Sequence, residues 1–250
     1  MGNWDAVSIQ MVWFASDARR ADAAKLYSAF TGSTPDTSQT SKVPVPPTMH
    51  LSAASGAVAD LNTAITVQPG RIDVVLQQVD DGSDGPVLLQ HTDRVIQEMA
   101  KKANIVGREL SSVTRLALVT NLFQQADNIG AANEAAASLF GLKLPDYNVT
   151  DLAFQVNSRS PLDANSGGIL VNRFLKFGVA SFQSVTIDVG NQAVSPRNVE
   201  AVGANLTLDI NIVPSFIPLS EDVQDQVWDK LVAETLKLRE IGSVEGLWYA

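Results

Sequence analysis

The residues of this chain that could bind a metal or take part in catalysis are carboxylates and two histidines, because the sequence contains no cysteine. Asp80, Asp81 and Asp84 alternate with small residues in DDGSDG, and carboxylates at such spacing can wrap a calcium ion. Counted from Asp80, however, an EF-hand loop would need an oxygen ligand at Gly82 and a glutamate at His91. The spacing therefore favours a solvated acidic loop, and we expect neither a metal site nor a cofactor.

Catalytic signatures are absent from the sequence. It contains no phosphate-binding glycine loop, no nucleophile elbow, and two histidines, His50 and His91, in unrelated contexts. Asp73 and Asp209 each interrupt an otherwise apolar strand pattern, and acids of this kind could serve a hydrolase if they lined a cleft. We expect both on the solvent-facing side of their strands, so the catalytic residues stay unknown.

The stretch ILVNRFLKF, residues 169–177, interleaves basic and aromatic side chains. Arg173 and Lys176 beside phenylalanines are typical of strands that stack single-stranded bases. Phe174 and Phe177 are three residues apart, however, so on a strand they point to opposite faces. We keep Arg173 and Lys176 as candidate binding residues.

Four tryptophans occur, two of them near the chain ends. Trp4 and Trp248 are candidates for docking onto a partner, because aromatic residues dominate the energetics of protein interfaces. Trp13 and Trp228 lie within apolar patterns, and we expect them in the core.

Charge and hydropathy exclude several classes of protein. The chain has 27 acidic and 18 basic residues and a net charge of −9, which disfavours duplex nucleic acid and anionic membrane surfaces. No apolar run approaches the roughly 18–20 residues of a membrane helix, and no signal peptide pattern is visible at the N-terminus. We therefore expect a soluble, cytoplasmic protein.

Hydrophobic periodicity predicts alternating strands and helices. The turn Gln68-Pro69-Gly70-Arg71 fits a type II turn between two strands, since proline sets φ at its second position and glycine allows positive φ at its third. The predicted strands cover 7–14, 49–54, 61–67, 72–79, 113–123, 149–157, 169–177, 182–189 and 205–213, and the predicted helices cover about 16–30, 92–106, 128–140 and 221–241.

The chain repeats itself at an offset of 110 residues. SAFTGSTPD, residues 28–36, matches SLFGLKLPD, residues 138–146, at the same place in the order of predicted elements. This indicates an α+β protein of two similar halves, residues 1–108 and 109–250, which could also form one continuous domain. Each half reads strand, helix, strands, helix, and we expect an antiparallel sheet with helices packed on one face.

Two segments carry a family resemblance. VTRLALVTNLF and the run from NLTLDINI through PLSEDVQDQVWDKLVAETLKLREIGSVEGL together resemble a sporadically distributed family of uncharacterised bacterial proteins. The resemblance implies a bacterial setting. It transfers no catalytic residue, since no function is established for that family.

These observations lead to a functional hypothesis. We expect a non-enzymatic binding or assembly component of a bacterial multi-protein complex, which acts on a protein partner or through self-association. One alternative is an Asp/Glu-dependent hydrolase or nucleotide-handling enzyme with a cleft between the halves. The other is a single-stranded nucleic-acid-binding module of duplicated α+β units, which the net charge disfavours.

Overall fold

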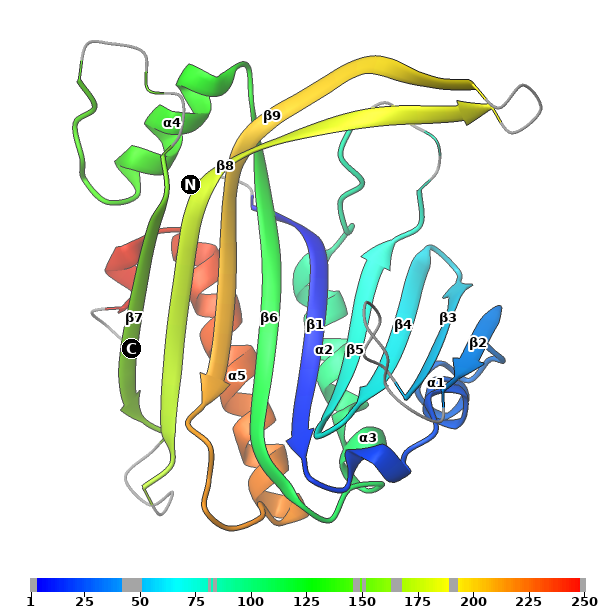
Figure 1. The fold of residues 1–250 in the computed structure, drawn as a ribbon. Coiled ribbons are helices and arrows are strands. Elements are labelled where there is room, and N and C mark those ends of the chain that lie inside the picture. Colours follow the sequence, from blue (N-terminus) through cyan, green and yellow to red (C-terminus); the bar gives the residue numbers. More distant parts are fainter. Residues whose placement is uncertain are drawn as a thin grey trace.

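The structure is a computed structural model that describes residues 4–41, 51–80, 82, 85–145, 149, 152–162, 168–188 and 193–247. Its strands form one nine-stranded antiparallel sheet in the order β2-β3-β4-β5-β1-β6-β9-β8-β7 (Figure 1). The strands are β1 (Asp5–Ala15), β2 (Thr37–Thr40), β3 (Ser52–Val58), β4 (Leu61–Gln68), β5 (Arg71–Gln78), β6 (Val113–Ala126), β7 (Phe154–Pro161), β8 (Leu170–Asp188) and β9 (Ala193–Ile212).

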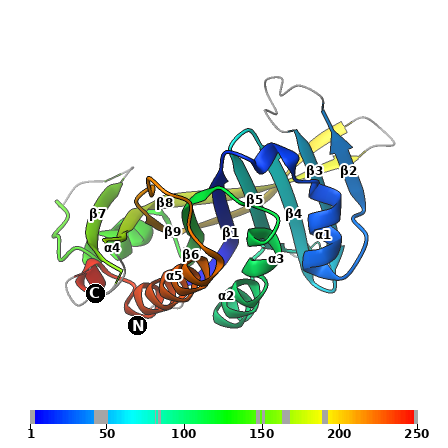
Figure 2. The same ribbon diagram turned by 90° about the horizontal axis from the view of Figure 1, so that it is seen from below.

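The helices all lie against one face of this sheet, as the view from below shows (Figure 2). Helix α5 runs behind β6 and β9, whereas α1 covers β3 and β4. The helices are α1 (Ala23–Thr31), α2 (Thr92–Lys101), α3 (Ala103–Gly107), α4 (Ile129–Ser138) and α5 (Glu221–Ile241), with short 3₁₀ turns η1 (Ala18–Arg20) and η2 (Val244–Leu247). The predicted α+β class, with an antiparallel sheet and helices on one face, is confirmed.

The two predicted halves meet at the centre of the sheet, where β1 pairs with β6. Outward from this pair the order is β5-β4-β3 on one side and β9-β8-β7 on the other, and β2 is an additional edge strand. The boundary at residues 108 and 109 falls between α3 and β6, within one continuous sheet. The strand order is thus alike in both halves, whereas an internal duplication stays a prediction.

The first helix begins later than predicted. Asp22 caps α1, since its carboxylate accepts hydrogen bonds from the backbone N–H groups of Ala24 and Lys25. Asp17 instead accepts hydrogen bonds from the backbone and hydroxyl of Ser111 and from the hydroxyl of Ser112. Burial alone would raise the pKa of Asp17, but these hydrogen bonds outweigh it and lower the pKa to about 2. The predicted start was wrong because Asp17 has partners remote in sequence.

The predicted strands 169–177 and 182–189 form one strand, β8, which pairs with β9 in a long hairpin. The hairpin extends beyond the sheet, because β6 ends at Ala126 opposite Val202 (Figure 1). At its base, a Cβ on Gly203 would lie 2.2 Å from the Gln124 carbonyl oxygen and 2.5 Å from the Phe123 ring. Glycine is therefore required where the hairpin leaves the sheet.

Other predicted elements need smaller corrections. The helix predicted at 92–106 is divided at Lys102 into α2 and α3, and the polar residues predicted as loop contain β2. The predicted hairpin around Pro69-Gly70 is confirmed, with Gly70 at a φ of 80°. The proline-rich residues 42–50 and the glycine-rich turn at 163–167 lie outside the described residues.

The core lies between the sheet and the helices. Residues Ile9, Met11 and Trp13 of β1 alternate toward the helices and are buried. The Trp13 and Trp228 rings lie 5.0 Å apart between centroids, so the prediction that both belong to the core is confirmed. Packing of this kind joins α5 to the central strand.

A buried ion pair also ties α5 to the sheet. Arg173 of β8 is 1% exposed, and its Nε and Nη2 each donate a hydrogen bond of 2.9 Å to a different oxygen of Glu234 on α5. The Arg173 Nη1 donates to the Ser160 hydroxyl at 2.8 Å, and Lys230 Nζ lies 2.7 Å from Glu234 Oε1. Burial would raise the pKa of Glu234, but the hydrogen bonds and charges of Arg173 and Lys230 lower it to about 2.

We predict that Glu234→Gln destabilises the protein by about 3–5 kcal/mol at pH 7, because it leaves the buried Arg173 without its counterion. Since the pKa of Glu234 is lower in the folded protein than its ordinary value of 4.5, the stabilisation is complete above pH 4.5. It is lost as the pH falls toward about 2, so the difference between wild type and Glu234→Gln should shrink in that range.

Urea unfolding at pH 7 and at pH 3 measures this difference. Glu98→Gln is the matched control, because Glu98 pairs with Arg94 on the surface at 3.9 Å and should cost at most about 1 kcal/mol. Equal losses in the two variants at pH 7 would show that the Arg173–Glu234 pair has no special role.

Candidate functional site

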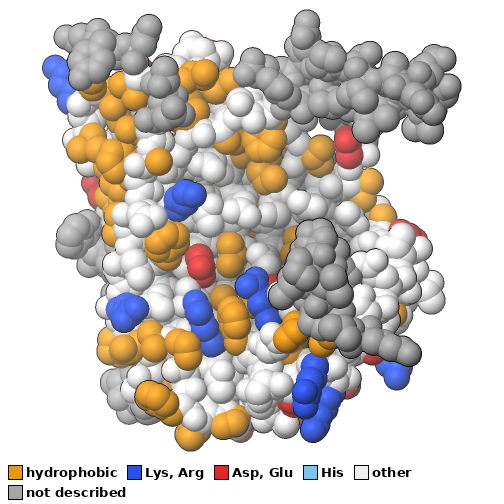
Figure 3. Space-filling view, in the orientation of Figure 1, with side chains coloured by type: hydrophobic (Ala, Val, Ile, Leu, Met, Phe, Trp, Pro, Cys, Tyr) orange, Lys and Arg blue, Asp and Glu red, His pale blue; other side chains and the backbone are white. Residues whose placement is uncertain are grey.

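The face of the sheet opposite the helices is the candidate site, and we call it the uncovered face because no described helix lies against it (Figures 1 and 2). Four cross-strand rows make up its centre, and they pass through Phe14, Val12, Gln10 and Ser8 of β1. Alternation on the strands places these side chains away from the helices. Figure 3 views this face and shows basic, acidic and apolar side chains mixed across it.

Phe14 is flanked by two arginines. It pairs with Arg71 on β5 and with Arg115 on β6, so the three side chains form one row. The guanidinium carbons lie 5.3 Å (Arg71) and 4.9 Å (Arg115) from the centroid of the Phe14 ring. Both distances are within the range of cation–π attraction.

Arg71 is neutralised within the protein. Its Nε donates to the two oxygens of Asp73 at 2.8 and 2.9 Å, and its Nη2 donates to Oδ1 at 2.7 Å. Gln10 Nε2 also donates to Asp73 Oδ1 at 2.7 Å. Asp73 is therefore 4% exposed although it lies on the uncovered face, because its neighbours enclose it.

Arg115 has no such counterion. Among the residues that the structure describes, no carboxylate oxygen lies within 4.0 Å of its guanidinium. Its Nε is buried without a hydrogen-bond acceptor, while the side chain as a whole is half-buried. The Nε is enclosed by the protein, so an acceptor from outside the chain can reach the half-buried Arg115 only at the Nη end of its guanidinium.

The other half of the uncovered face carries a hydrogen-bonded polar network. Arg159 donates to Asn172, Asn172 donates to Asn211 at 2.9 Å, and Asn211 donates to Asp209 at 2.8 Å, across β7, β8 and β9. A second chain joins Thr207, Asn121 and Ser8. These bonds hold the polar side chains in fixed positions, which lowers the entropy that binding would cost.

The uncovered face differs in charge from the whole molecule. Within the four rows, the register places four basic and two acidic side chains on the described strands: Arg71, Arg115, Arg159 and Lys176 against Asp73 and Asp209. The whole chain carries −9. Positive charge is thus concentrated on this face, and charge of one sign attracts ligands of the other.

The four candidate binding residues are dispersed by the fold. Lys176 is exposed on the uncovered face, whereas Arg173 points to the helices and is used by Glu234. Trp4 is 2% exposed, so it is part of the core rather than a surface. Trp248 lies outside the described residues. Of the three candidate binding residues that the structure describes, Lys176 is therefore the one that a ligand can reach.

The two acids singled out for catalysis are both on the uncovered face. Asp209 is half-buried there, but Asp73 is 4% exposed, so the prediction that Asp73 faces solvent was wrong because Arg71 and Gln10 enclose it. Asp73 is on β5 and Asp209 is on β9, three strand intervals apart in the sheet order. At about 4.8 Å per interval this is about 14 Å, which exceeds the separation of paired catalytic carboxylates. The arrangement does not form an acid–base pair.

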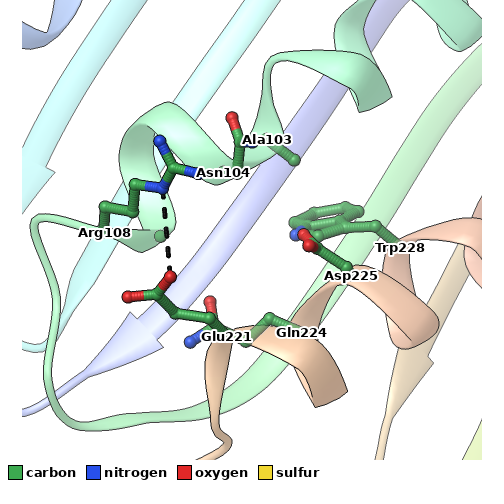
Figure 4. A pocket seen from close by; sticks show the side chains of 8 residues that line it. Ala103, Asn104, Arg108, Glu221, Gln224, Asp225 and Trp228 are labelled. Atoms are coloured by element: carbon green, nitrogen blue, oxygen red, sulfur yellow. Dashed lines mark ion pairs between the residues drawn. The ribbon is translucent and has the colours of Figure 1, made fainter.

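The cavity between α3 and α5 is too small for a ligand. Its volume is about 20 Å³, room for roughly one water molecule, and Arg108 and Glu221 stand 3.9 Å apart at its edge (Figure 4). Trp13 and Trp228 nearby each have a buried ring N–H without an acceptor. We assign this cavity to packing.

A larger hollow lies at the edge of the sheet. Its volume is about 290 Å³, and small residues of β2, β3 and β4 line it, including Ala53, Ser55, Ala64 and Thr66. It carries no charged side chain, and it joins the rows of the uncovered face. We regard it as a shallow extension of that face.

The described residues contain no group of three or more histidine, aspartate or glutamate side chains placed to hold a metal ion. The acidic loop DDGSDG lies partly outside the description. In the described part of the chain, no helix has the length and apolar character that crossing a bilayer requires.

Comparison with known proteins yields no relative: no family model, no curated protein and no solved structure matches this chain. The resemblance to the bacterial family stays a prediction. The residues of the uncovered face must therefore be interpreted from their own geometry.

Sequence reasoning missed Phe14, Arg71 and Arg115. Phe14 and Arg115 lie in predicted strands and Arg71 ends the predicted turn, but 57 residues separate Phe14 from Arg71 and 101 separate it from Arg115. The available signal was alternation, which places Phe14 opposite the face of Ile9, Met11 and Trp13. Strand pairing, which the sequence did not predict, brings the arginines to it.

We predict that Asp73→Asn lowers the free energy of unfolding by about 1–3 kcal/mol, because Arg71 then loses its charged acceptor. Asp229→Asn on the exposed side of α5 is the control and should change it by less than about 0.5 kcal/mol. Thermal or urea unfolding measures both variants, and equal stability of the two would contradict a role for Asp73 in holding Arg71.

Proposed function

We propose that this protein is a non-enzymatic binding or assembly component of a multi-protein complex, which contacts its partner through the uncovered face of the sheet. The observation that carries the proposal is the contrast between the two faces. One face is covered by helices, and the other holds ordered polar rows with excess positive charge on an acidic chain. The bacterial setting rests on the family resemblance alone.

The composition of the uncovered face supports protein contact. Phe14, Val75, Val119 and Phe174 are half-buried among arginine, asparagine and glutamine side chains. Aromatic and arginine side chains are enriched in protein interfaces, where an apolar centre is mixed with hydrogen-bonding groups. A surface of this kind can exclude water around a few strong contacts.

The size of the uncovered face is also adequate. Six strands, β4 to β8 in the sheet order, span about 29 Å at about 4.8 Å per strand. Four rows, two residues apart, span about 26 Å at about 3.3 Å per residue. The resulting area of about 750 Å² is close to the roughly 800 Å² that one partner contributes to a stable protein–protein interface.

The alternative functions receive less support from the geometry. A hydrolase would need convergent acids, and Asp73 and Asp209 are too far apart. A single-strand nucleic-acid binder would need Arg173 on the surface, but Arg173 forms a buried ion pair. The partner is a different protein or a second copy of the chain, and these differ in the mass of the complex.

We predict that Lys176→Glu reduces recovery of the partner at least about tenfold when the tagged protein is purified from its native host, because the variant reverses a charge on the uncovered face. Lys101→Glu, which reverses an exposed charge on α2, is the matched control and should leave recovery unchanged. Native mass spectrometry gives the stoichiometry. Equal loss in both variants, or a monomer without partner in the wild type, would overturn the proposal.

A further inference from the structure

Strands β5 and β6 flank β1 and present nearly the same residues to it. Both are antiparallel to β1, so they run in the same direction. Phe14 faces Arg71 on one side and Arg115 on the other. One row further, Val12 faces Asp73 on one side and Ala117 on the other. The arginines are therefore equivalent in register, while the residues two positions after them are not.

The difference leaves Arg115 without the carboxylate that Arg71 has. On β5, Asp73 lies two residues after Arg71 on the same face and binds its guanidinium. On β6, the position two residues after Arg115 is Ala117, which has no polar side chain. Arg115 accordingly has a buried Nε without an acceptor, and no described carboxylate lies within 4.0 Å of it. The sheet has the cation of a second pair without the anion.

We infer that Arg115 binds an aspartate or glutamate side chain of an acidic protein segment, which supplies the counterion that Asp73 supplies to Arg71. Because Ala117 is 4% exposed and the Arg115 Nε is buried, the segment contacts the Nη end of the half-buried guanidinium. This inference rests on the proposed function, because it names the chemistry of the partner that the uncovered face contacts. Arginine suits the role, since its planar guanidinium can donate two parallel hydrogen bonds to a carboxylate. Phe14 holds that guanidinium in place through the cation–π contact.

An acidic protein segment fits better than a nucleic acid. The Phe14 ring already contacts two guanidiniums, so stacking a base on it would require displacing one of them. The four rows carry two acids beside four basic residues, so the face has no continuous row of cations that could follow a polyphosphate backbone. A single carboxylate needs one free arginine, which is what the geometry provides.

The test introduces a carboxylate next to Arg115 by substitution and measures whether an acidic peptide still binds. A decaglutamate peptide is the probe, titrated calorimetrically at about 50 mM salt, where surface charges are weakly screened. We expect Ala117→Asp to weaken its binding at least about tenfold, because the new carboxylate would occupy Arg115. Ala117→Asn has the same shape without the charge, and its affinity should stay within about threefold of wild type.

A second variant keeps the test decisive if Ala117→Asp fails to fold. Arg115→Gln removes the cation and should also weaken decaglutamate binding at least about tenfold, whereas Arg94→Gln on α2 should not. The side-chain N–H signal of Arg115 in a nuclear magnetic resonance spectrum should shift on addition of decaglutamate. No binding by the wild type, or equal binding by wild type and Arg115→Gln, would overturn the inference.

Two further probes separate the possible sources of an anion. Inorganic phosphate and decathymidylate are titrated under the same conditions, and tighter binding of either than of decaglutamate would overturn the assignment of an acidic protein segment. Failure here is distinguishable from failure of the proposed function. If Lys176→Glu loses the native partner while Arg115→Gln retains it, the uncovered face binds a partner but Arg115 does not anchor it.

Discussion

The pairing of β1 with β6 is the constraint on which the rest of the structure depends. It joins the two halves of the chain into one sheet. The register of this pair depends on which side chains of both strands must be buried. The apolar residues Ile9, Met11 and Trp13 must face the helices. A shift by one residue would turn them to the opposite face, so the register is strongly specified. The row that contains Phe14 and Arg115 follows from that requirement.

Two arginines show that the two faces of the sheet differ in the environment they give to the same residue type. Arg173 and Arg115 both lie near the beginning of long strands, but one points to the helices and the other away from them. Arg173 is enclosed, and Glu234, Lys230 and Ser160 satisfy it, because an unpaired charge there would be very unfavourable. Arg115 is half-buried on the opposite face and has no described counterion. The same residue type is thus structural on one face and available on the other.

Much of the architecture was predictable because it depends on local pattern. The hairpin around Pro69-Gly70, the alternation that buries Trp13 and the N-terminal capping of α5 by Ser220 are encoded within short segments. The start of α1 was not predictable, because Asp17 bonds to Ser111 and Ser112 across the fold. The predicted surface roles of Trp4 and Arg173 likewise depended on which neighbours would enclose them.

The sequence by itself determined the fold class, which alternate side chains of each strand share a face, and the acidic character of the chain. These properties follow from residue types at fixed local spacing. It also indicated that Asp73 and Asp209 face away from the core. Only the tertiary structure decided that Phe14 lies between Arg71 and Arg115, and that Asp73 neutralises one arginine while Ala117 leaves the other without a counterion. The physical reason is that strand pairing joins residues remote in the chain, and no local pattern specifies which edges will meet.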